Sequence, residues 1–286
     1  MTKILACVDG SPYTPSVCDH AAWAAARTGD PVELLHAIGR RDIPSVPHGL
    51  DLSGSLDAGE TERLMAELAE MDARRAKLMQ GRGRAVLEDA RARVQAAGVA
   101  QAEVRLRNGD LLDALAEAEG DARLTVIGKR GSAADFAQSH LGSNLERVVR
   151  ASRKPVLVAS RDFKPVERFL IAFDGSASAT RAVEAVAGGT LLRGLDCRLL
   201  TVGANPAEAN PALDGAAARL REAGYRVQVD ILPGEPEEVI PDHAARNGVD
   251  LLVMGAYGHS RIRQLIVGST TTAMVRACRI PVLMVR

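Results

Sequence analysis

The sequence carries one pattern of short apolar segments twice, and this repeat constrains the fold more than any other feature. Residues 4–11 match residues 170–176, because both are apolar runs that end in Asp-Gly-Ser and lead into an Ala-rich helical stretch. Residues 124–128 match residues 251–255 as apolar runs that end in glycine. A chain of 286 residues is long enough for two such units, each with a core of its own. We therefore expect two domains of one fold.

Each copy alternates short apolar strands with helical stretches. Near-continuous apolar strands separated by helices indicate a parallel sheet that is covered by helices on both faces. Right-handed crossovers then give a doubly wound fold, in which ligands bind at the carboxyl ends of the strands. We predict an α/β chain of two tandem doubly wound parallel five-stranded sheets, in domains at residues 1–160 and 168–286. The strands are expected near residues 3–8, 32–38, 102–107, 124–128 and 155–159, and near 168–173, 197–202, 226–232, 250–255 and 281–285.

The first copy is longer than the second. Asp9 and Asp174 lie 165 residues apart, whereas Pro155 and Pro281 lie only 126 residues apart, so the first copy carries 39 extra residues. We expect a helical insertion at about residues 40–80, beginning with a loop rich in Pro, Gly and Ser. Apolar residues near helical spacing favour an amphipathic helix or a helical hairpin there. Two roles stay open for it: a lid packed on its own domain, or an oligomer or partner interface. The apolar residues are Leu64, Leu68, Met71 and Met79.

Composition and charge argue against several classes of protein. Hydrophobic residues make up 47% of the chain, which favours a globular protein over a disordered one. Lys plus Arg equals Asp plus Glu at 36 each, which argues against broad binding to nucleic acid or anionic membranes. No apolar run approaches the roughly 18 residues of a membrane helix, and the N-terminus lacks a signal-peptide pattern, so we expect a cytoplasmic protein. Four scattered cysteines suit small buried positions in that reducing compartment: Cys7, Cys18, Cys197 and Cys278.

Spaced glycines follow the fourth apolar strand of the second copy. Gly255 is followed after two residues by Gly258, and after nine more by Gly268 and Ser269. Glycine lets the backbone come close to a ligand, and consecutive N–H groups in such a loop can form an anion site. The hydroxyls of Ser269 and Thr270 then lie at the start of the next helix, where free N–H groups and a positive dipole end favour phosphate. The alternative is a turn followed by a helix-capping serine that binds no ligand.

An aspartate ends the first strand of each copy, Asp9 in the first and Asp174 in the second. In this topology that end of the strand faces the expected crevice. A carboxylate there can accept hydrogen bonds from a base amino group or from ribose hydroxyls. Its alternative role is to cap the helix that follows. The nearby glycine loop favours ligand contact.

The first copy carries a variant of the glycine loop. Gly128, Lys129 and Gly131 begin it, and the cationic side chain of Lys129 suits phosphate. Ten residues, rather than nine, then separate Gly131 from Gly142 and Ser143. Ser143 also begins a Ser-x-x-Glu capping box, whose glutamate could satisfy the N–H donors that phosphate would otherwise use. We therefore expect the second copy to be the stronger binding site.

Taken together, these features resemble the universal stress protein family in tandem form, with two UspA-like domains. The resemblance covers both copies and is most specific at the family's ATP motif, G-x2-G-x9-G-S/T, which Gly255, Gly258, Gly268 and Ser269 match. It implies an adenine nucleotide alpha hydrolase-like fold and an ATP-binding, cytoplasmic protein linked to stress survival. Family members usually dimerise, often through their last strands. The strands near residues 155–159 and 281–285 are therefore candidates to pair within this chain, which would protect two exposed sheet edges.

The resemblance also implies which residues form the two binding sites. Asp174 and Asp9 look like the family's adenine-contacting aspartate, and Val202 and Ala37 look like the residue that lines the base or ribose pocket. The full sets are Asp174, Val202, Met254, Gly255, Gly258, Gly268, Ser269 and Thr270 in the second copy, and Asp9, Ala37, Gly128, Lys129, Gly131, Gly142 and Ser143 in the first.

Three functions stay open at this point. The first is an ATP-binding stress-response module, in which nucleotide occupancy modulates conformation or partner binding. The second is a slow ATP hydrolase at the same site, and the third is a nucleotide-free scaffold that uses the helical insertion. The sequence has no P-loop, no His or Cys pair with metal-ligand spacing and no credible triad, so we expect no catalytic residues and no resident metal. Magnesium could arrive with the nucleotide. The expected partners are an adenine nucleotide and the other half of the chain, with a further homodimer left open.

Overall fold

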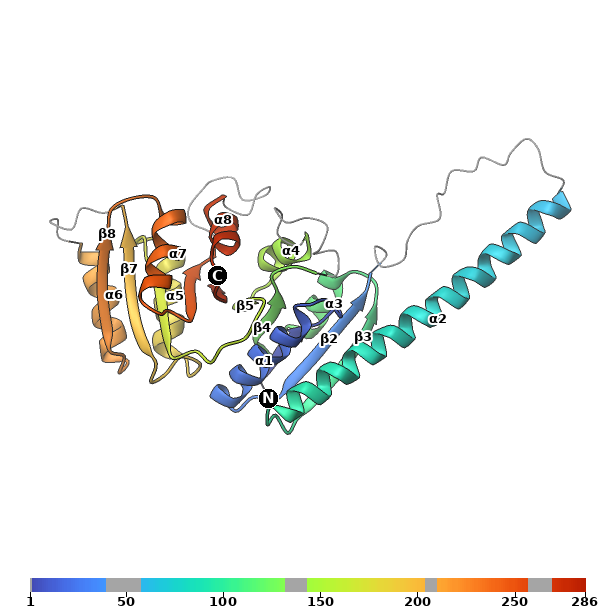
Figure 1. Ribbon diagram of the computed structural model, residues 1–286, viewed down its shortest axis with the longest axis horizontal. Coiled ribbons are helices and arrows are strands. Elements are labelled where there is room, and N and C mark those ends of the chain that lie inside the picture. The colour runs from blue at the N-terminus through green and yellow to red at the C-terminus, as the bar shows by residue number, and fades with distance from the viewer. Residues whose placement is uncertain (1, 40–57, 132–142, 204–209, 257–268) are drawn as a thin grey trace.

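The strands of both copies join into one ten-stranded sheet (Figure 1). The computed structural model describes residues 2–39, 58–131, 143–203, 210–256 and 269–286, and the side chains of residues 58–61, 143 and 269–272 are outside the description. The strands, in chain order, are β1 Lys3–Cys7, β2 Val32–Ile38, β3 Ala102–Asn108, β4 Ala122–Gly128, β5 Val156–Ala159, β6 Arg168–Ala172, β7 Asp196–Val202, β8 Val227–Leu232, β9 Leu251–Gly255 and β10 Val282–Val285.

The strand order β3-β2-β1-β4-β5-β10-β9-β6-β7-β8 places the same five-stranded arrangement on each side of the centre. Every neighbouring pair within a half is parallel, which confirms the prediction of two tandem doubly wound sheets. The halves meet where β5 and β10 pair antiparallel, with Leu157 opposite Leu283. Both of these side chains are buried, so the joined edges are covered. The two segments expected to pair thus contain the strands that do pair.

Helices cover both faces of the sheet (Figure 1). Strand residues alternate between the faces: Ile4 and Ala6 of β1 lie in one buried cluster, whereas Leu5 and Cys7 lie in the other. In the part of the chain that the structure describes, the helices are α1 Thr14–Thr28, α2 Ala58–Ala96, α3 Leu111–Ala118, α4 Ser143–Ala151, α5 Ala177–Gly188, α6 Pro211–Glu222, α7 Pro236–Arg246 and α8 Ser269–Ala277. The first buried cluster includes residues of α1, α2, α5 and α6, and the second includes residues of α3, α4, α7 and α8.

The described part of the helical insertion belongs to one continuous helix, α2, which runs on past residue 80 to Ala96. The reason is that the insertion extends a helix which the fold already contains. In the second half, α6 ends two residues before Gly224, and α2 ends two residues before the matching Gly98; both glycines have positive φ. The alternative of a helical hairpin is therefore wrong, because nothing interrupts α2 between Ala58 and Ala96.

The lid alternative is also wrong for the described part of the insertion. Only the C-terminal part of α2 packs on the domain, through buried side chains such as Leu87 and Val94. Residues 62–82 are exposed or half-exposed around the whole helix. Figure 1 shows this part of α2 projecting well beyond the sheet.

All four cysteines are buried and free, as expected from their scattered positions. Burial raises the pKa of the Cys7, Cys18 and Cys197 thiols to about 12, and that of Cys278 to about 11. Each thiol therefore stays protonated at neutral pH. Among the helices described, none has both the length and the apolar character needed to cross a membrane.

Candidate functional site

The predicted aspartate and the predicted glycine loop meet at the carboxyl ends of β1 and β4. These strands are parallel neighbours, with Cys7 opposite Ile127, so the residues that follow them emerge at the same edge of the sheet. A Cβ atom added to Gly131 would lie 3.0 Å from Oδ2 of Asp9. The structure thus brings Asp9 and Gly131 together, although they are far apart in sequence. In the second half, β6 and β9 are parallel neighbours in the same way.

Both aspartates hold the same tight turn. Oδ1 of Asp9 accepts a hydrogen bond from the backbone N–H of Ser11 at 3.0 Å, and Oδ1 of Asp174 accepts one from Ser176 at 2.9 Å. The intervening glycines have φ of 73° and 77°, in the left-handed region. Asp174 is exposed and Asp9 is half-buried. One carboxylate oxygen of each aspartate therefore fixes the turn that leads into the helix. This agrees in part with the alternative that the aspartates cap the helix. In the second half the cap itself is Ser176, whose hydroxyl accepts from Ala179 N–H.

A polar side chain from the second strand of each half fixes the backbone just before the aspartate. His36 Nδ1 makes a hydrogen bond of 2.7 Å with the carbonyl of Val8, and Thr201 Oγ1 donates one of 2.8 Å to the carbonyl of Phe173. Because His36 and Thr201 align in the repeat, this shared role had a signal in the sequence: a polar residue at the same place in two apolar strands. Sequence reasoning left both residues out of the site.

The first glycine of each loop is required by packing as well as by any ligand. A Cβ atom on Gly255 would lie 2.5 Å from the backbone carbonyl carbon of Ser178, at the start of α5. A Cβ atom on Gly128 would lie 2.8 Å from Cβ of Tyr13, just before α1. The fourth strand and the segment after the first strand thus approach too closely for a side chain. These contacts with Tyr13 and Ser178 have no signal in the sequence.

The predicted pocket-lining residues lie at the ends of their strands. Ala37 in β2 and Val202 in β7 are half-buried and pack against the same buried cluster. Met254 in β9 is 9% exposed and lies beside Ala172 of β6 in the sheet. These three side chains are apolar, as is usual for the lining of a ligand pocket.

Part of the predicted site falls outside the described residues. This holds for Gly142, Gly258 and Gly268, and for the side chains of Ser143, Ser269 and Thr270. The backbone is informative nonetheless, because α4 begins at Ser143 and α8 begins at Ser269, as predicted from the glycine-serine pairs. A helix N-terminus therefore follows the glycine loop in both halves. The side-chain hydrogen bonds of the capping box lie outside the description as well.

Comparison with known proteins shows the family to which this fold belongs. The model of the universal stress protein family matches residues 1–160 and again residues 165–286. The chain belongs to the universal stress protein family. A curated member, Universal stress protein Slr1230 of Synechocystis sp., is 38% identical over an alignment of 288 residues that covers 100% of this chain and 100% of that one.

Solved structures of similar architecture span the whole chain. A universal stress protein from Archaeoglobus fulgidus is 21% identical and superimposes with a TM-score of 0.69, covering 99% of this chain and 96% of that one. A functionally unknown protein from Pseudomonas aeruginosa is 17% identical with a TM-score of 0.59, covering 100% of this chain and 92% of that one. At these identities the likeness establishes the tandem universal stress protein fold alone.

Lys129, predicted to suit phosphate, reaches instead across the centre of this universal stress protein. Its ammonium donates a hydrogen bond to the backbone carbonyl of Cys278, directly after α8 of the other half. Burial lowers the pKa of Lys129 to about 8. A matching contact runs the other way, because Arg286 donates to the carbonyls of Arg150 and Ser152 at the end of α4, at 2.7 and 3.1 Å. Each half thus supplies a cation to the C-terminus of the other half's last helix.

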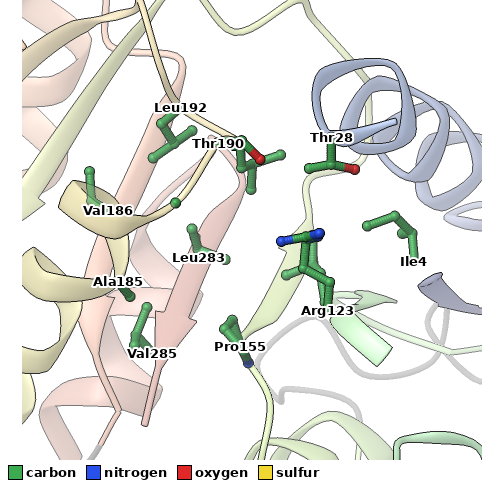
Figure 2. A pocket seen from close by; sticks show the side chains of 13 residues that line it. Ile4, Thr28, Arg123, Pro155, Ala185, Val186, Thr190, Leu192, Leu283 and Val285 are labelled. Atoms are coloured by element: carbon green, nitrogen blue, oxygen red, sulfur yellow. The ribbon is translucent and has the colours of Figure 1, made fainter. Parts of the chain in front are cut away.

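A cavity of about 180 Å³ lies at the junction of the two universal stress protein domains (Figure 2). Its lining includes Ile4 at the start of β1 and Pro155 just before β5, together with Leu283 of β10. In the first half these residues lie at the amino ends of the strands, opposite the end that carries Asp9. Arg123, which also lines the cavity, is held by the carboxylate of Asp30. The cavity is therefore separate from the candidate nucleotide site.

No group of three His, Cys, Asp or Glu side chains in the described part of the chain could hold a metal ion. Asp9 and Asp174 are each followed by Gly-Ser and bring no second acidic residue with them. The residues present thus suit hydrogen bonding to a nucleotide more than direct coordination of a metal.

Proposed function

We propose that this chain is a cytoplasmic ATP-binding module whose nucleotide occupancy modulates its conformation or its choice of partner. The observation that carries the proposal is the meeting of Asp9 with Gly131 at the carboxyl ends of two parallel strands. The same elements recur in the second half, where the sequence matches the complete ATP motif of the family. Carboxyl ends of parallel strands at the change of strand order are where doubly wound folds bind ligands.

The second half is proposed as the stronger site. Asp174 would accept hydrogen bonds from the adenine amino group or the ribose, and Val202 and Met254 would line the pocket. The glycine loop from Gly255 through Gly258 to Gly268 would supply backbone N–H groups to the phosphates. Ser269 and Thr270, at the start of α8, would add hydroxyls and the positive end of the helix dipole. Magnesium would be held mainly by the phosphates and water.

The first half is proposed as a weaker site of the same kind, built from Asp9, Ala37, Gly128, Gly131 and the Gly142-Ser143 pair. Its loop is one residue longer than the motif, and its helix start carries a glutamate that competes with phosphate for N–H donors. The ammonium of Lys129, which could have compensated, already bonds to the carbonyl of Cys278. The Lys129 side chain is therefore directed to the other half of the chain, and Arg130 is the neighbouring cation beside Gly131.

The pairing of β5 with β10 supports the further proposal that the two halves act as an intramolecular pseudo-dimer. Each helix that begins at a glycine loop ends against a cation from the other half. Nucleotide at the N-terminus of α8 would thus act on a helix whose C-terminus touches Lys129. A ligand changes a conformational equilibrium only by binding one state more tightly, and this contact gives the halves a route for such a difference.

Equilibrium dialysis of the full chain with labelled ATP tests the binding proposal. The informative variant is Asp174→Asn, because the asparagine side-chain oxygen can still accept the Ser176 N–H and keep the turn. We expect it to weaken binding by about tenfold or more, the usual effect of losing a hydrogen bond to a charged group. Asp9→Asn is the matched control and should weaken binding less. Wild-type chain that neither carries nor binds adenine nucleotide would disprove the proposal.

Further variants of the same protein test whether the second site is the stronger one and whether bound ATP is hydrolysed. Gly258→Val should remove more binding than Gly131→Val, and equal losses would contradict a stronger second site. Multiple-turnover phosphate release above that of a Gly268→Val control would favour slow ATP hydrolysis at the same site.

A further inference from the structure

The projecting part of α2, residues 62–82, exposes apolar side chains that its own domain does not cover. In the described part of the chain, five large hydrophobic side chains are exposed, and four of them lie on this segment. They are Leu64 (39% exposed), Met65 (58%), Met71 (57%) and Leu78 (73%). Scattered exposed hydrophobics are ordinary, but such a concentration on one projecting helix marks a contact surface.

Three of these residues, Leu64, Met71 and Leu78, share the spacing of a coiled-coil seam with two half-exposed residues, Leu68 and Arg75. Leu64, Leu68, Met71, Arg75 and Leu78 follow one another at intervals of four, three, four and three residues. A helix that repeats this interval keeps one narrow stripe toward a partner helix. Beside the stripe lie mainly alanine and charged residues, with Met65 and Met79 along one of its sides. A helix with this pattern fits another helix rather than a flat surface or a membrane.

The helix is already formed without its partner. Its C-terminal part is anchored by Leu87, Ala90 and Val94, which are all buried against the domain. On the free part, Arg74 pairs with Glu70 one turn earlier at 2.6 Å. The nucleation cost that makes short isolated helices unstable is thus already met. A partner would gain the apolar contact at a small ordering cost.

We infer that residues 62–82 of α2 form an antiparallel coiled coil with the same segment of a second copy of this chain. The charges at the sides of the seam select a second copy in this orientation. When Leu68 of one copy lies against Met71 of the other, Glu67 faces the partner's Arg74 and Arg74 faces the partner's Glu67. The segment is therefore complementary to itself about its own centre.

A parallel pairing of the same segments is disfavoured by two like-charge contacts. Arg75 would lie in the seam against Arg75 of the other copy, and Glu67 would face Asp72 across the side of the seam. In the antiparallel pairing, Arg75 instead lies against Leu64, on which its aliphatic part can pack while the guanidinium stays in water. The antiparallel form also places the two domains at opposite ends of the coil. Because α2 projects well beyond its own sheet (Figure 1), the domains then stay clear of each other.

Sedimentation equilibrium of the full chain, over a range of concentrations, tests this inference. We expect a monomer–dimer equilibrium that Met71→Glu shifts to monomer by at least tenfold in the dissociation constant. The matched control is Ala73→Glu, which adds the same charge on the opposite side of the same exposed segment and should leave the dimer intact. Both sites are exposed, and far-UV circular dichroism shows whether the fold is retained. A wild-type chain that stays monomeric, or a dimer that survives Met71→Glu, overturns the inference.

Charge exchange tests the orientation. Glu67→Arg alone and Arg74→Glu alone should each weaken self-association, whereas an equal mixture of the two variants should dimerise at least as well as wild type. In that mixture every antiparallel contact joins an arginine to a glutamate. A parallel coil behaves oppositely, because Glu67→Arg would then pair with Asp72 and strengthen the homodimer. Strengthening by Glu67→Arg alone, or no gain in the mixture, overturns the antiparallel pairing.

Discussion

Gly255 shows how one residue can have a packing role and a binding role at the same position. The sequence motif explains it by phosphate, yet its missing side chain also leaves room for the backbone of Ser178. Gly128 has the same relation to Tyr13. The two roles agree physically, because a strand end that approaches the next helix start closely also brings backbone N–H groups into the crevice.

The packing role predicts a loss of stability that does not depend on nucleotide. Gly255→Ala places a Cβ atom 2.5 to 2.7 Å from three atoms of Ser178, two of them backbone, so the segments must separate. We expect urea unfolding of ligand-free protein to show a loss of about 1–3 kcal/mol in the free energy of unfolding, as for other overpacked sites. Gly215→Ala, inside α6 with nothing within 4 Å, should stabilise by about 0.5–1 kcal/mol instead. Unchanged stability of Gly255→Ala would leave phosphate as the sole reason for this glycine.

Residue identities in the site were predictable to the extent that they repeat. Asp9 and Asp174 stand out because the same Asp-Gly-Ser follows the first strand twice. The sequence did not predict the turns that these aspartates form. It also did not predict the hydrogen bonds of His36 and Thr201 with the carbonyls just before the aspartates. The residue type of Lys129 did not reveal its contact. Its charge suggested phosphate, but its amine donates to a carbonyl that lies 149 residues away in sequence.

At the scale of the element, the single helix α2 has two parts with different surroundings. The part from Gly83 onward corresponds to α6 of the second half and packs as α6 does, whereas residues 62–82 have no domain beneath them. The offset between the copies predicted the extra residues. An apolar stripe alone does not tell whether a helix faces its own domain or another molecule, so the choice between a lid and an interface required the structure.

This division predicts opposite outcomes for two leucines on the same helix. Leu87→Ala removes a side chain that is 2% exposed and lies in the core, so we expect a loss of about 2–5 kcal/mol in the free energy of unfolding. Leu78→Ala removes one that is 73% exposed, and unfolding of dilute protein should change by less than about 0.5 kcal/mol. Chemical denaturation of both variants at equal concentration is the measurement. Similar losses for both would mean that the projecting segment packs on the domain after all.

At the scale of the whole molecule, the two halves are tied together by more than the strand pair. Besides β5 and β10, Lys129 reaches Cys278 and Arg286 reaches the end of α4. On the other face, Arg27 of α1 donates to the carbonyl of Leu191 at 3.0 Å. The repeat predicted two domains, whereas the resemblance to the universal stress protein family implied which edges pair, and that pairing covers last strands that would otherwise be exposed. It did not predict the cationic contacts, because Lys129 and Arg286 occupy different places in their copies.

The buried contact of Lys129 predicts a specific pH dependence of the junction. Its pKa falls from an ordinary value of 10.5 to about 8 in the folded protein, because burial disfavours the charged form. Between these two pH values the unfolded chain binds the extra proton, so this residue makes the free energy of unfolding rise as the pH rises. Near neutral pH the lysine is charged in both states, and the cost of burying that charge is fully present.

Comparison with Lys129→Met isolates this effect, because methionine keeps an apolar side chain at the junction and does not titrate. The four cysteines, whose raised pKa values destabilise the fold above about pH 9, are present in both proteins and largely cancel. We expect the stability of wild type relative to Lys129→Met to increase by on the order of 1 kcal/mol between about pH 7.5 and pH 9.5. Urea unfolding at both pH values measures the difference. Parallel pH profiles would show that the amine is solvated, and that the halves are held together without it.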